Sequence, residues 1–477
     1  MIITNFSESA LPLIRLMYGC FGILTLIPFL THLNFHFKSS KYNGYIFDGA
    51  LPEFICSPIA SRILVLSWIL TLVCIGLGIY PVLFAAYNFM LCRTYFVKLR
   101  WNCLNRGFGA TGFLMNWLAM AVLLSEVTAL PGISRSTQDA ALYFIRADFA
   151  LIMLSAGAYK LFSGYFKGEG MEYALVNPMW SNLSGVYSRL SPKNKMFPFL
   201  NHNTWFWEVA AGFLMLIPMS MPTGSVLIAL SFIFVAVHFR LNFLPGLIFT
   251  CCLFYLCPWT DKISASGGLA EFNVTVPVFI DKFLSVCIPA GLAVVVASHL
   301  CLWINFLRRG NGSSGIVNWF NRYANHAGII IWRVFTADIS NFIVNIYSES
   351  GAGHRKLLSE YGKALNLFGS RYSNTIESVT LACIFNTLKY QPSAVELLDK
   401  KIRMYSESVS GESSSKIVFQ VSRIHKKKNF NAEVSAEFTF DRISKTVTHN
   451  IFKNEWFQPA ESSLTKSTKQ LGSYESE

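Results

Sequence analysis

Long apolar segments separated by short polar ones dominate the first part of this 477-residue chain. Each is close to the roughly 20 residues that an α-helix needs to cross the hydrocarbon core of a bilayer. The pattern predicts an all-α membrane bundle of about eight to nine spans, with a tight turn at Tyr80–Pro81 between the second and third. The expected spans are residues 11–30, 61–79, 81–98, 107–126, 141–163, 203–221, 224–241, 243–258 and 284–306.

The pattern changes after Arg309, where the sequence GNGSSG has the composition of a flexible joint. Residues 354–368 and 375–404 have the apolar spacing of amphipathic helices. Trp332–Tyr347, rich in aromatic and β-branched residues, favours a strand or a segment at the membrane interface. Lys416–Ile424 and Glu433–Phe440 alternate apolar and polar residues on either side of HKKKNFN, which predicts a β-hairpin.

These patterns divide the chain into three regions. We expect a transmembrane domain over residues 1–309, a small soluble α+β domain over residues 310–460, and a disordered tail over residues 461–477.

Composition and charge support a membrane location. The chain is 53% hydrophobic and 14% charged, whereas soluble domains carry about 25% charged residues. Of its net charge of +13, much lies in the loops after the third, fifth and ninth segments. Basic loops lie mostly in the cytoplasm, which predicts an external N-terminus and an internal C-terminus. Membrane lipid is the expected partner, and nucleic acid is not.

Lys160 is the first candidate for chemistry, because it lies near the end of the apolar segment 141–163. A charged side chain inside a membrane helix costs about 2.5–3.5 kcal/mol on insertion scales. One interpretation is a side chain that extends to the interface to keep its ammonium group in water. The other is a desolvated amine with a lowered pKa, which could act as a base.

Several other ionisable residues lie in or near apolar segments. Glu172 follows the glycines at 164, 168 and 170, and could bind a cation, orient Lys160 or be a solvated loop carboxylate. His238 could be a proton shuttle or a hydrogen-bonded interior histidine, and His299 could serve similarly. Arg146 and Asp148 are two residues apart, so we expect them to pair with groups on other helices. Glu208 is expected near a helix end. No metal-ligand spacing, phosphate-binding loop or nucleophile elbow occurs, so no metal is predicted.

The segment AGAYKLFSGYFKGEGMEY at 156–173 resembles a known family. Ala156-Gly157, Lys160-Leu161, Gly168 and Met171-Glu172-Tyr173 match, without insertion, a run in the vitamin K-dependent γ-carboxylase. Tyr159, Tyr165 and Lys167 stand where that enzyme has a lysine, a tryptophan and an acidic residue. The wider group is the horizontally transferred transmembrane (HTTM) domain family, which is mostly bacterial. The resemblance covers roughly residues 10–345, and implies a multi-pass protein of the bacterial inner membrane.

The resemblance also implies a reaction. Lys160 would deprotonate a reduced naphthoquinone of the vitamin K type, oxygen would convert it to an epoxide, and the strong base so formed would allow carboxylation of a glutamate. By the same match His238 would be a proton partner and Glu172 an orienting group. The cofactor would lie near Tyr159, Gly168, Met171 and Tyr173.

Three functions therefore remain open. The first is a carboxylase-like lyase that acts on a peptide or small-molecule substrate. The second is a non-enzymatic membrane helper for the maturation, export or immunity of a secreted peptide. The third is a transporter whose path is lined by Arg146, Asp148 and Lys160. An enzyme requires Lys160 to be desolvated, whereas a lysine that faces lipid or bulk water would exclude this function.

Overall fold

The fold was obtained as a computed structural model. It describes residues 10–31, 54, 57–100, 104, 106–241, 243–256, 275–307, 315–332, 341–350, 353–359, 370–390, 395–408 and 415–453. The predicted tail at 461–477 and most of the predicted joint after Arg309 lie outside these residues.

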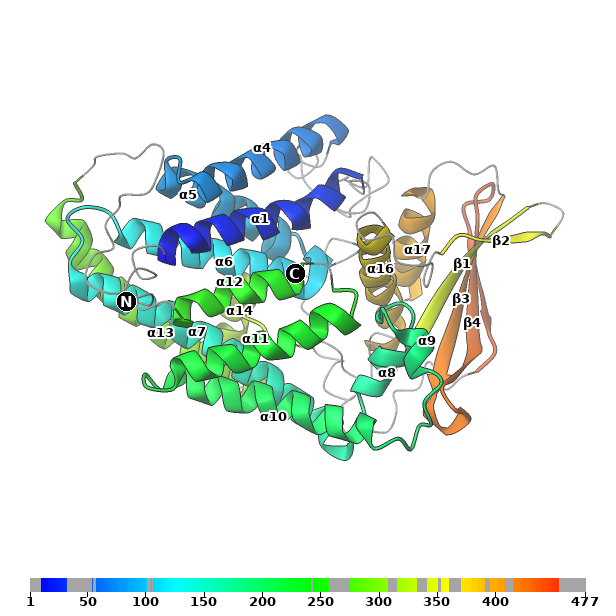
Figure 1. Ribbon diagram of the computed structural model, residues 1–477. Helices are drawn as coiled ribbons and strands as arrows, with labels where there is room; N and C mark the ends of the chain where they lie inside the picture. The colour runs from blue at the N-terminus through cyan, green and yellow to red at the C-terminus, as the bar shows by residue number, and fades with distance from the viewer. Residues whose placement is uncertain are drawn as a thin grey trace.

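The apolar segments fold into one helical bundle (Figure 1). All nine predicted segments contain a helix, and six of the described helices are long and apolar enough to cross a membrane. The chain is thus an integral membrane protein by its architecture, but the predicted count of eight to nine spans is not confirmed. The six are α1 (Ala10–Thr31), α4 (Pro58–Leu77), α6 (Gly109–Thr128), α7 (Arg135–Phe162), α11 (Met221–His238) and α13 (Val278–Leu307).

Three of the nine predicted segments form helices that are too short or too polar to count as membrane spans. Helix α5 (Pro81–Cys92) and helix α12 (Leu244–Leu256) have 12 and 13 residues. Helix α10 (Met196–Leu216) has 21 residues, but its first half contains the polar run Asn201–Thr204. The turn before α5 agrees with the prediction, because α4 ends at the left-handed Gly78 and α5 begins at Pro81.

Short elements follow several of the long helices along the chain. They are a π-helical turn η3 (Arg93–Lys98), the 3-10 turns η5 (Arg106–Phe108) and η6 (Tyr165–Lys167), and the helices α8 (Met171–Val176), α9 (Ser184–Tyr187) and α14 (Gly315–Ala327). Apolar side chains fill the interior of the bundle, and others on α4, α11 and α13 are exposed on its outside, as a lipid-facing surface requires.

A five-stranded antiparallel sheet forms the C-terminal part, in the order β2-β1-β3-β4-β5. Its strands are β1 (Phe342–Glu349), β2 (Arg355–Leu357), β3 (Lys416–His425), β4 (Asn431–Asp441) and β5 (Val447–Ile451). The predicted hairpin is confirmed as β3 and β4. The predicted helix at 375–404 corresponds to α16 (Ser370–Tyr390) and α17 (Val395–Ser408). Phe385 of α16 packs against Phe419 and Phe438, so these helices cover one face of the sheet.

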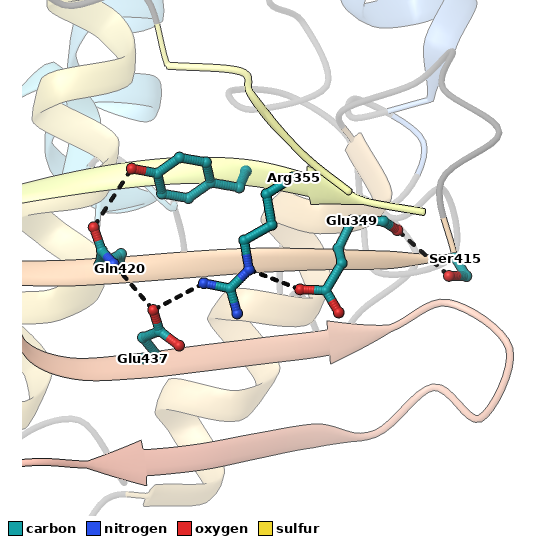
Figure 2. Close-up of polar contacts among 6 residues, drawn as sticks. Glu349, Arg355, Ser415, Gln420 and Glu437 are labelled. Carbon is teal, nitrogen blue, oxygen red and sulfur yellow. Dashed lines mark hydrogen bonds and ion pairs between the residues drawn. The ribbon is translucent and has the colours of Figure 1, made fainter. Parts of the chain in front are cut away.

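The predicted helix at 354–368 is wrong at its start, where β2 pairs with β1. Figure 2 shows a contact that accompanies this pairing, in which Arg355 lies between Glu349 of β1 and Glu437 of β4. Its Nε and Nη1 atoms donate to these carboxylates over 2.8 and 3.1 Å. Both carboxylates raise the pKa of Arg355. The Arg355 side chain therefore joins the edge strand β2 to two other strands, a long-range contact that helical spacing does not reveal.

The sheet contacts the helical bundle directly rather than through a separate linker. In Figure 1, α8 and α9 lie between the long helices and the sheet. Asn177, after α8, donates to the carbonyl oxygen of Phe342 over 2.8 Å, and Ser378 of α16 donates to that of Met179 over 3.0 Å. The apolar side chains of α8 and Met179 belong to the same buried cluster as those of the sheet. The two parts therefore share a hydrophobic core.

Candidate functional site

Helices α7 and α10 approach closely because glycines lie where they cross. A Cβ atom on Gly157 would lie 2.7 Å from the backbone nitrogen of Val209 and 2.9 Å from Cβ of Glu208. A Cβ atom on Gly212 would lie 2.8 Å from the nitrogen of Leu154. Small residues at a helix crossing allow two backbones to come together in this way. Gly157 of the sequence motif thus brings Glu208 against the helix that carries Lys160.

Lys160 and Glu208 form a buried ion pair at this crossing. Nζ of Lys160 donates to Oε1 of Glu208, and the two side chains are 6% and 8% exposed. Lys160 is therefore desolvated, and the alternative in which its ammonium group extends into water is wrong. The other carboxylate oxygen of Glu208, Oε2, has no hydrogen-bond partner among the described residues. The ammonium charge of Lys160 and the carboxylate charge of Glu208 therefore balance each other, and Oε2 of Glu208 is a buried hydrogen-bond acceptor.

The glycine-rich loop after α7 makes the predicted tight turn. Gly164 and Gly168 have φ values of 113° and 76° and flank the 3-10 turn η6. Gly170 has a φ of 154°, and a Cβ atom there would overlap the ring of Tyr165. Since most side chains avoid this backbone conformation, glycine is the residue type that lets the loop close over Tyr165. The ring of Tyr165 is fully buried as a result.

Glu172 is fully buried in this loop region, at the start of α8. Its Oε2 accepts hydrogen bonds of 2.9 Å from the backbone nitrogen of Gly170 and from Nδ2 of Asn201. Its Oε1 accepts a hydrogen bond of 2.7 Å from Nζ of Lys426, in the turn between β3 and β4. The interpretation of Glu172 as a solvated carboxylate is therefore wrong. Its cationic partner is Lys426 rather than Lys160.

Tyr165 adjoins both buried carboxylates. Burial raises the pKa of its phenol well above the ordinary value, and the nearby charges of Glu208 and Glu172 act in the same direction. Burial similarly raises the pKa of Tyr173 to about 12, helped by Glu169 and Glu172. The Lys160–Glu208 pair and the Glu172 cluster are thus neighbours across Tyr165, which remains a neutral phenol at physiological pH.

The structure does not bring His238 to this pair. Its Nδ1 donates to the carbonyl oxygen of Phe234 over 2.8 Å, and its ring stacks on that of Phe234 with centroids 4.0 Å apart. The ring of Tyr187 on α9 also lies near it, with centroids 5.9 Å apart. His238 is thus a hydrogen-bonded histidine at the end of α11, and its described contacts include neither Lys160 nor Glu172.

The four residues that the resemblance associates with the cofactor occupy different surroundings. Tyr159 is buried on α7, with its ring 5.4 Å from that of Phe306 on α13. Met171 is buried, and its backbone nitrogen donates to Asn201. Gly168 lies beside Pro198. Tyr173 lies near Glu169 and Glu172.

The predicted pairing of Arg146 and Asp148 with other helices is confirmed. Nε of Arg146 donates to the carbonyl oxygen of Phe254 on α12 over 2.7 Å. Asp148 contacts Trp117 of α6 and His299 of α13.

Sequence reasoning missed the roles of Glu208, Asn201 and Lys426. Glu208 was expected near a helix end, but α10 begins seven residues before the predicted span and puts Glu208 in its second half. A carboxylate inside an apolar helix is itself a signal for a buried cation, whereas nothing local to HKKKNFN indicates a partner 254 residues away. No group of three or more His, Cys, Asp or Glu that could hold a metal ion occurs among the described residues. Comparison of the chain with protein-family models, with curated proteins and with solved structures finds no match.

Proposed function

We propose that this integral membrane protein is a member of the HTTM group and a carboxylase-like lyase in which Lys160 is the catalytic base. The observation that carries the proposal is the buried Lys160–Glu208 pair, with its second carboxylate oxygen unpartnered among the described residues. Burial excludes water from the amine, as base catalysis on a weak acid requires.

The pair can supply a neutral amine without a change in its total charge. If the proton of the Lys160 ammonium group moves to Oε1 of Glu208, the N–H bond breaks and an O–H bond forms. Two opposite charges in a low-dielectric interior then become two neutral groups, which reduces the cost of their burial. The amine lone pair is left free to accept a proton from a substrate hydroxyl group.

The relative basicities favour an amine for this task. A phenol-type hydroxyl has an ordinary pKa of about 10 and an alkyl amine about 10.4, whereas a glutamate carboxyl has about 4.3. Each unit corresponds to about 1.36 kcal/mol, so a carboxylate alone is weaker as a base by roughly 8 kcal/mol. The amine and a phenol-type hydroxyl are matched, which is the condition for efficient proton transfer.

A reduced naphthoquinone is the substrate class that the sequence resemblance implies, and the buried donor and acceptor fit its chemistry. When bound, it supplies an acidic hydroxyl and a ring that oxygen can convert to an epoxide. Lys160 would accept the hydroxyl proton, and Glu208 would hold the Lys160 amine in position through Oε1. Tyr165, buried and neutral, would keep water from the amine.

The experiment is epoxide formation from a reduced naphthoquinone by the purified protein in the presence of oxygen. We expect Lys160→Ala to abolish it and Glu208→Gln to reduce it at least tenfold. Lys167→Ala is the matched control, because Lys167 is exposed and only seven residues away. Size-exclusion chromatography and thermal unfolding establish that each variant is folded.

A folded wild-type protein that makes no epoxide would contradict the proposal, and would favour the helper function in peptide maturation, export or immunity. Equal activity of wild type and Lys160→Ala would also contradict it, because the base would then be another group.

A further inference from the structure

A second buried ionisable pair lies between α7 and α13. Asp148, in the middle of α7, is 5% exposed, and His299 of α13 is 3% exposed. Oδ1 of Asp148 lies 3.5 Å from Nε2 of His299, and Oδ2 of Asp148 accepts a hydrogen bond of 2.9 Å from Nε1 of Trp117 on α6. All three helices are long and apolar enough to span a membrane. The pair therefore lies in the interior of the bundle.

Three polar atoms of this pair lack a hydrogen bond. They are Oδ1 of Asp148 and both ring nitrogens of His299, which have no hydrogen-bond partner among the described residues. A buried polar atom without a partner costs about 1–3 kcal/mol. A carboxylate and an imidazole lie side by side in the bundle despite this cost. Their unpaired atoms can therefore accept a proton.

Other charged groups on these helices have partners of their own. Nε of Arg146 donates to the carbonyl oxygen of Phe254, and Glu126 of α6 is paired with Arg15 of α1. Glu208 of α10 is paired with Lys160. Helix α12 contributes Tyr255 near Asp148, and a phenol is ordinarily neutral at physiological pH. His299 is the titratable side chain of α13 that faces Asp148.

We propose that Asp148 and His299 form a proton-binding site inside the membrane-spanning bundle, separate from the Lys160–Glu208 pair. On uptake, a lone pair of an imidazole nitrogen forms an N–H bond with a proton from water, and the Asp148 carboxylate balances the charge. On release, that N–H bond breaks and the proton returns to water or passes to Oδ1 of Asp148. Trp117 holds the carboxylate in place through its other oxygen.

The two pairs are distinct sites on one helix. Asp148 and Lys160 are twelve residues apart, which corresponds to about 18 Å at the α-helical rise of about 1.5 Å per residue. The Asp148–His299 site joins α7 to α13, whereas the Lys160–Glu208 pair joins α7 to α10. Proton binding at the first site does not depend on the function proposed for the second.

The test follows the protonation of His299 in the full-length protein in lipid nanodiscs. Histidine is labelled with nitrogen-15, and the nine histidines are recorded by NMR from about pH 3 to about pH 9, which brackets the ordinary pKa values of Asp and His. His299→Gln identifies the His299 signals by their absence. We expect these signals to titrate, and Asp148→Asn to move their midpoint to lower pH by about 1–3 units, since it removes the neighbouring negative charge.

The matched control is Asp139→Asn on the same helix, where the side chain is exposed and pairs with Arg135. It should leave the midpoint unchanged. If His299→Gln does not fold, infrared spectroscopy of wild type and Asp148→Asn provides an independent measurement. The wild-type spectrum should contain a buried carboxyl band that changes with pH and is absent from Asp148→Asn. His299 signals that do not titrate, or a midpoint equal in wild type and Asp148→Asn, would overturn the proposal. So would a pH-independent infrared spectrum of the Asp148 carboxyl.

Discussion

Lys426, in the turn between β3 and β4, donates a 2.7 Å hydrogen bond to Glu172, which is fully buried beside the glycine-rich loop that follows α7. This contact joins the sheet to the loop next to Lys160. The Lys426 side chain is 23% exposed, so the pair has one partner inside the protein and one at its surface.

Replacement of Lys426 by methionine should destabilise the sheet against the bundle. Loss of one partner of a buried pair costs about 3–5 kcal/mol, and the partial exposure of Lys426 reduces this to about 1–3 kcal/mol. Thermal unfolding and limited proteolysis of the protein in detergent measure the effect. Lys427→Met is the control, because Lys427 is exposed in the same turn. The double variant with Glu172→Gln should be more stable than Lys426→Met alone; if it is not, the ion pair is not the cause.

Glu208→Gln should destabilise the bundle, because it leaves the Lys160 ammonium group buried without a counter-charge. We expect a loss of about 3–5 kcal/mol, and a smaller loss when Lys160→Met is combined with Glu208→Gln. Unfolding in detergent is the measurement. The exposed pair Arg135–Asp139 on α7 provides the comparison, since Arg135→Ala should cost at most about 1 kcal/mol. If Glu208→Gln and Arg135→Ala reduced the free energy of unfolding equally, burial would not be the cause of the loss at the Lys160–Glu208 pair.

Gly157→Ala should separate α7 from α10. Its Cβ atom would meet the backbone of Val209 at 2.7 Å, and overpacking of this kind costs about 1–3 kcal/mol. Because the same crossing positions Glu208, epoxide formation should fall together with stability. Gly291→Ala on α13 is the control, since its nearest neighbour would be the Phe144 ring at 3.5 Å. A Gly157→Ala protein as stable and active as wild type would mean that the two helices do not cross so closely.

The C-terminal sheet should lose stability as the pH falls below about 6.5. Burial, followed by the nearby Arg423, lowers the pKa of His425 from its ordinary value of 6.5. His425 therefore binds a proton more readily in the unfolded chain than in the folded chain. Its contribution to stability is fully present above about pH 6.5 and declines as the pH falls below that value. A further loss should follow from Asp441 as the pH falls below about 3.8, because the backbone nitrogens of Ser444 and Ile443 lower its pKa from that ordinary value.

Thermal unfolding as a function of pH tests this dependence. His425→Gln should remove the decline in stability below about pH 6.5. His354→Gln should preserve it, because His354 is exposed directly before β2. A profile that is identical in wild type and His425→Gln would contradict the assignment.

Local patterns predicted much of the secondary structure. Apolar runs located a helix in each of the nine segments, and the alternation of apolar and polar residues in Lys416–Ile424 and Glu433–Phe440 located the central hairpin. The count of spans was harder, because α5 and α12 are apolar but short, and α10 is long but begins with polar residues. Length and hydropathy decide whether a helix can cross a membrane, and these three segments satisfy only one of the two conditions.

The candidate site was predictable only in part. Lys160 stood out as a cation in an apolar segment, and Gly170 as part of a tight turn, since both signals are local. Glu208 and Lys426 acquire their roles from contacts 48 and 254 residues away, which no periodicity encodes. His238 was selected for its residue type and apolar surroundings, but its position at the end of α11 gives it Phe234 and Tyr187 as neighbours.

The shared core of the bundle and the sheet has a consequence for synthesis of the protein. The nitrogen of Val344 on β1 bonds to the sulfur of Met179, and the two residues are 165 positions apart. When the ribosome has released the loop that contains Met179, the strands that cover it have not yet been made. The nascent chain therefore exposes this apolar surface while later membrane helices insert. Burial of the loop is completed last, so a prematurely terminated chain differs from the finished protein in a surface that cellular proteases can recognise.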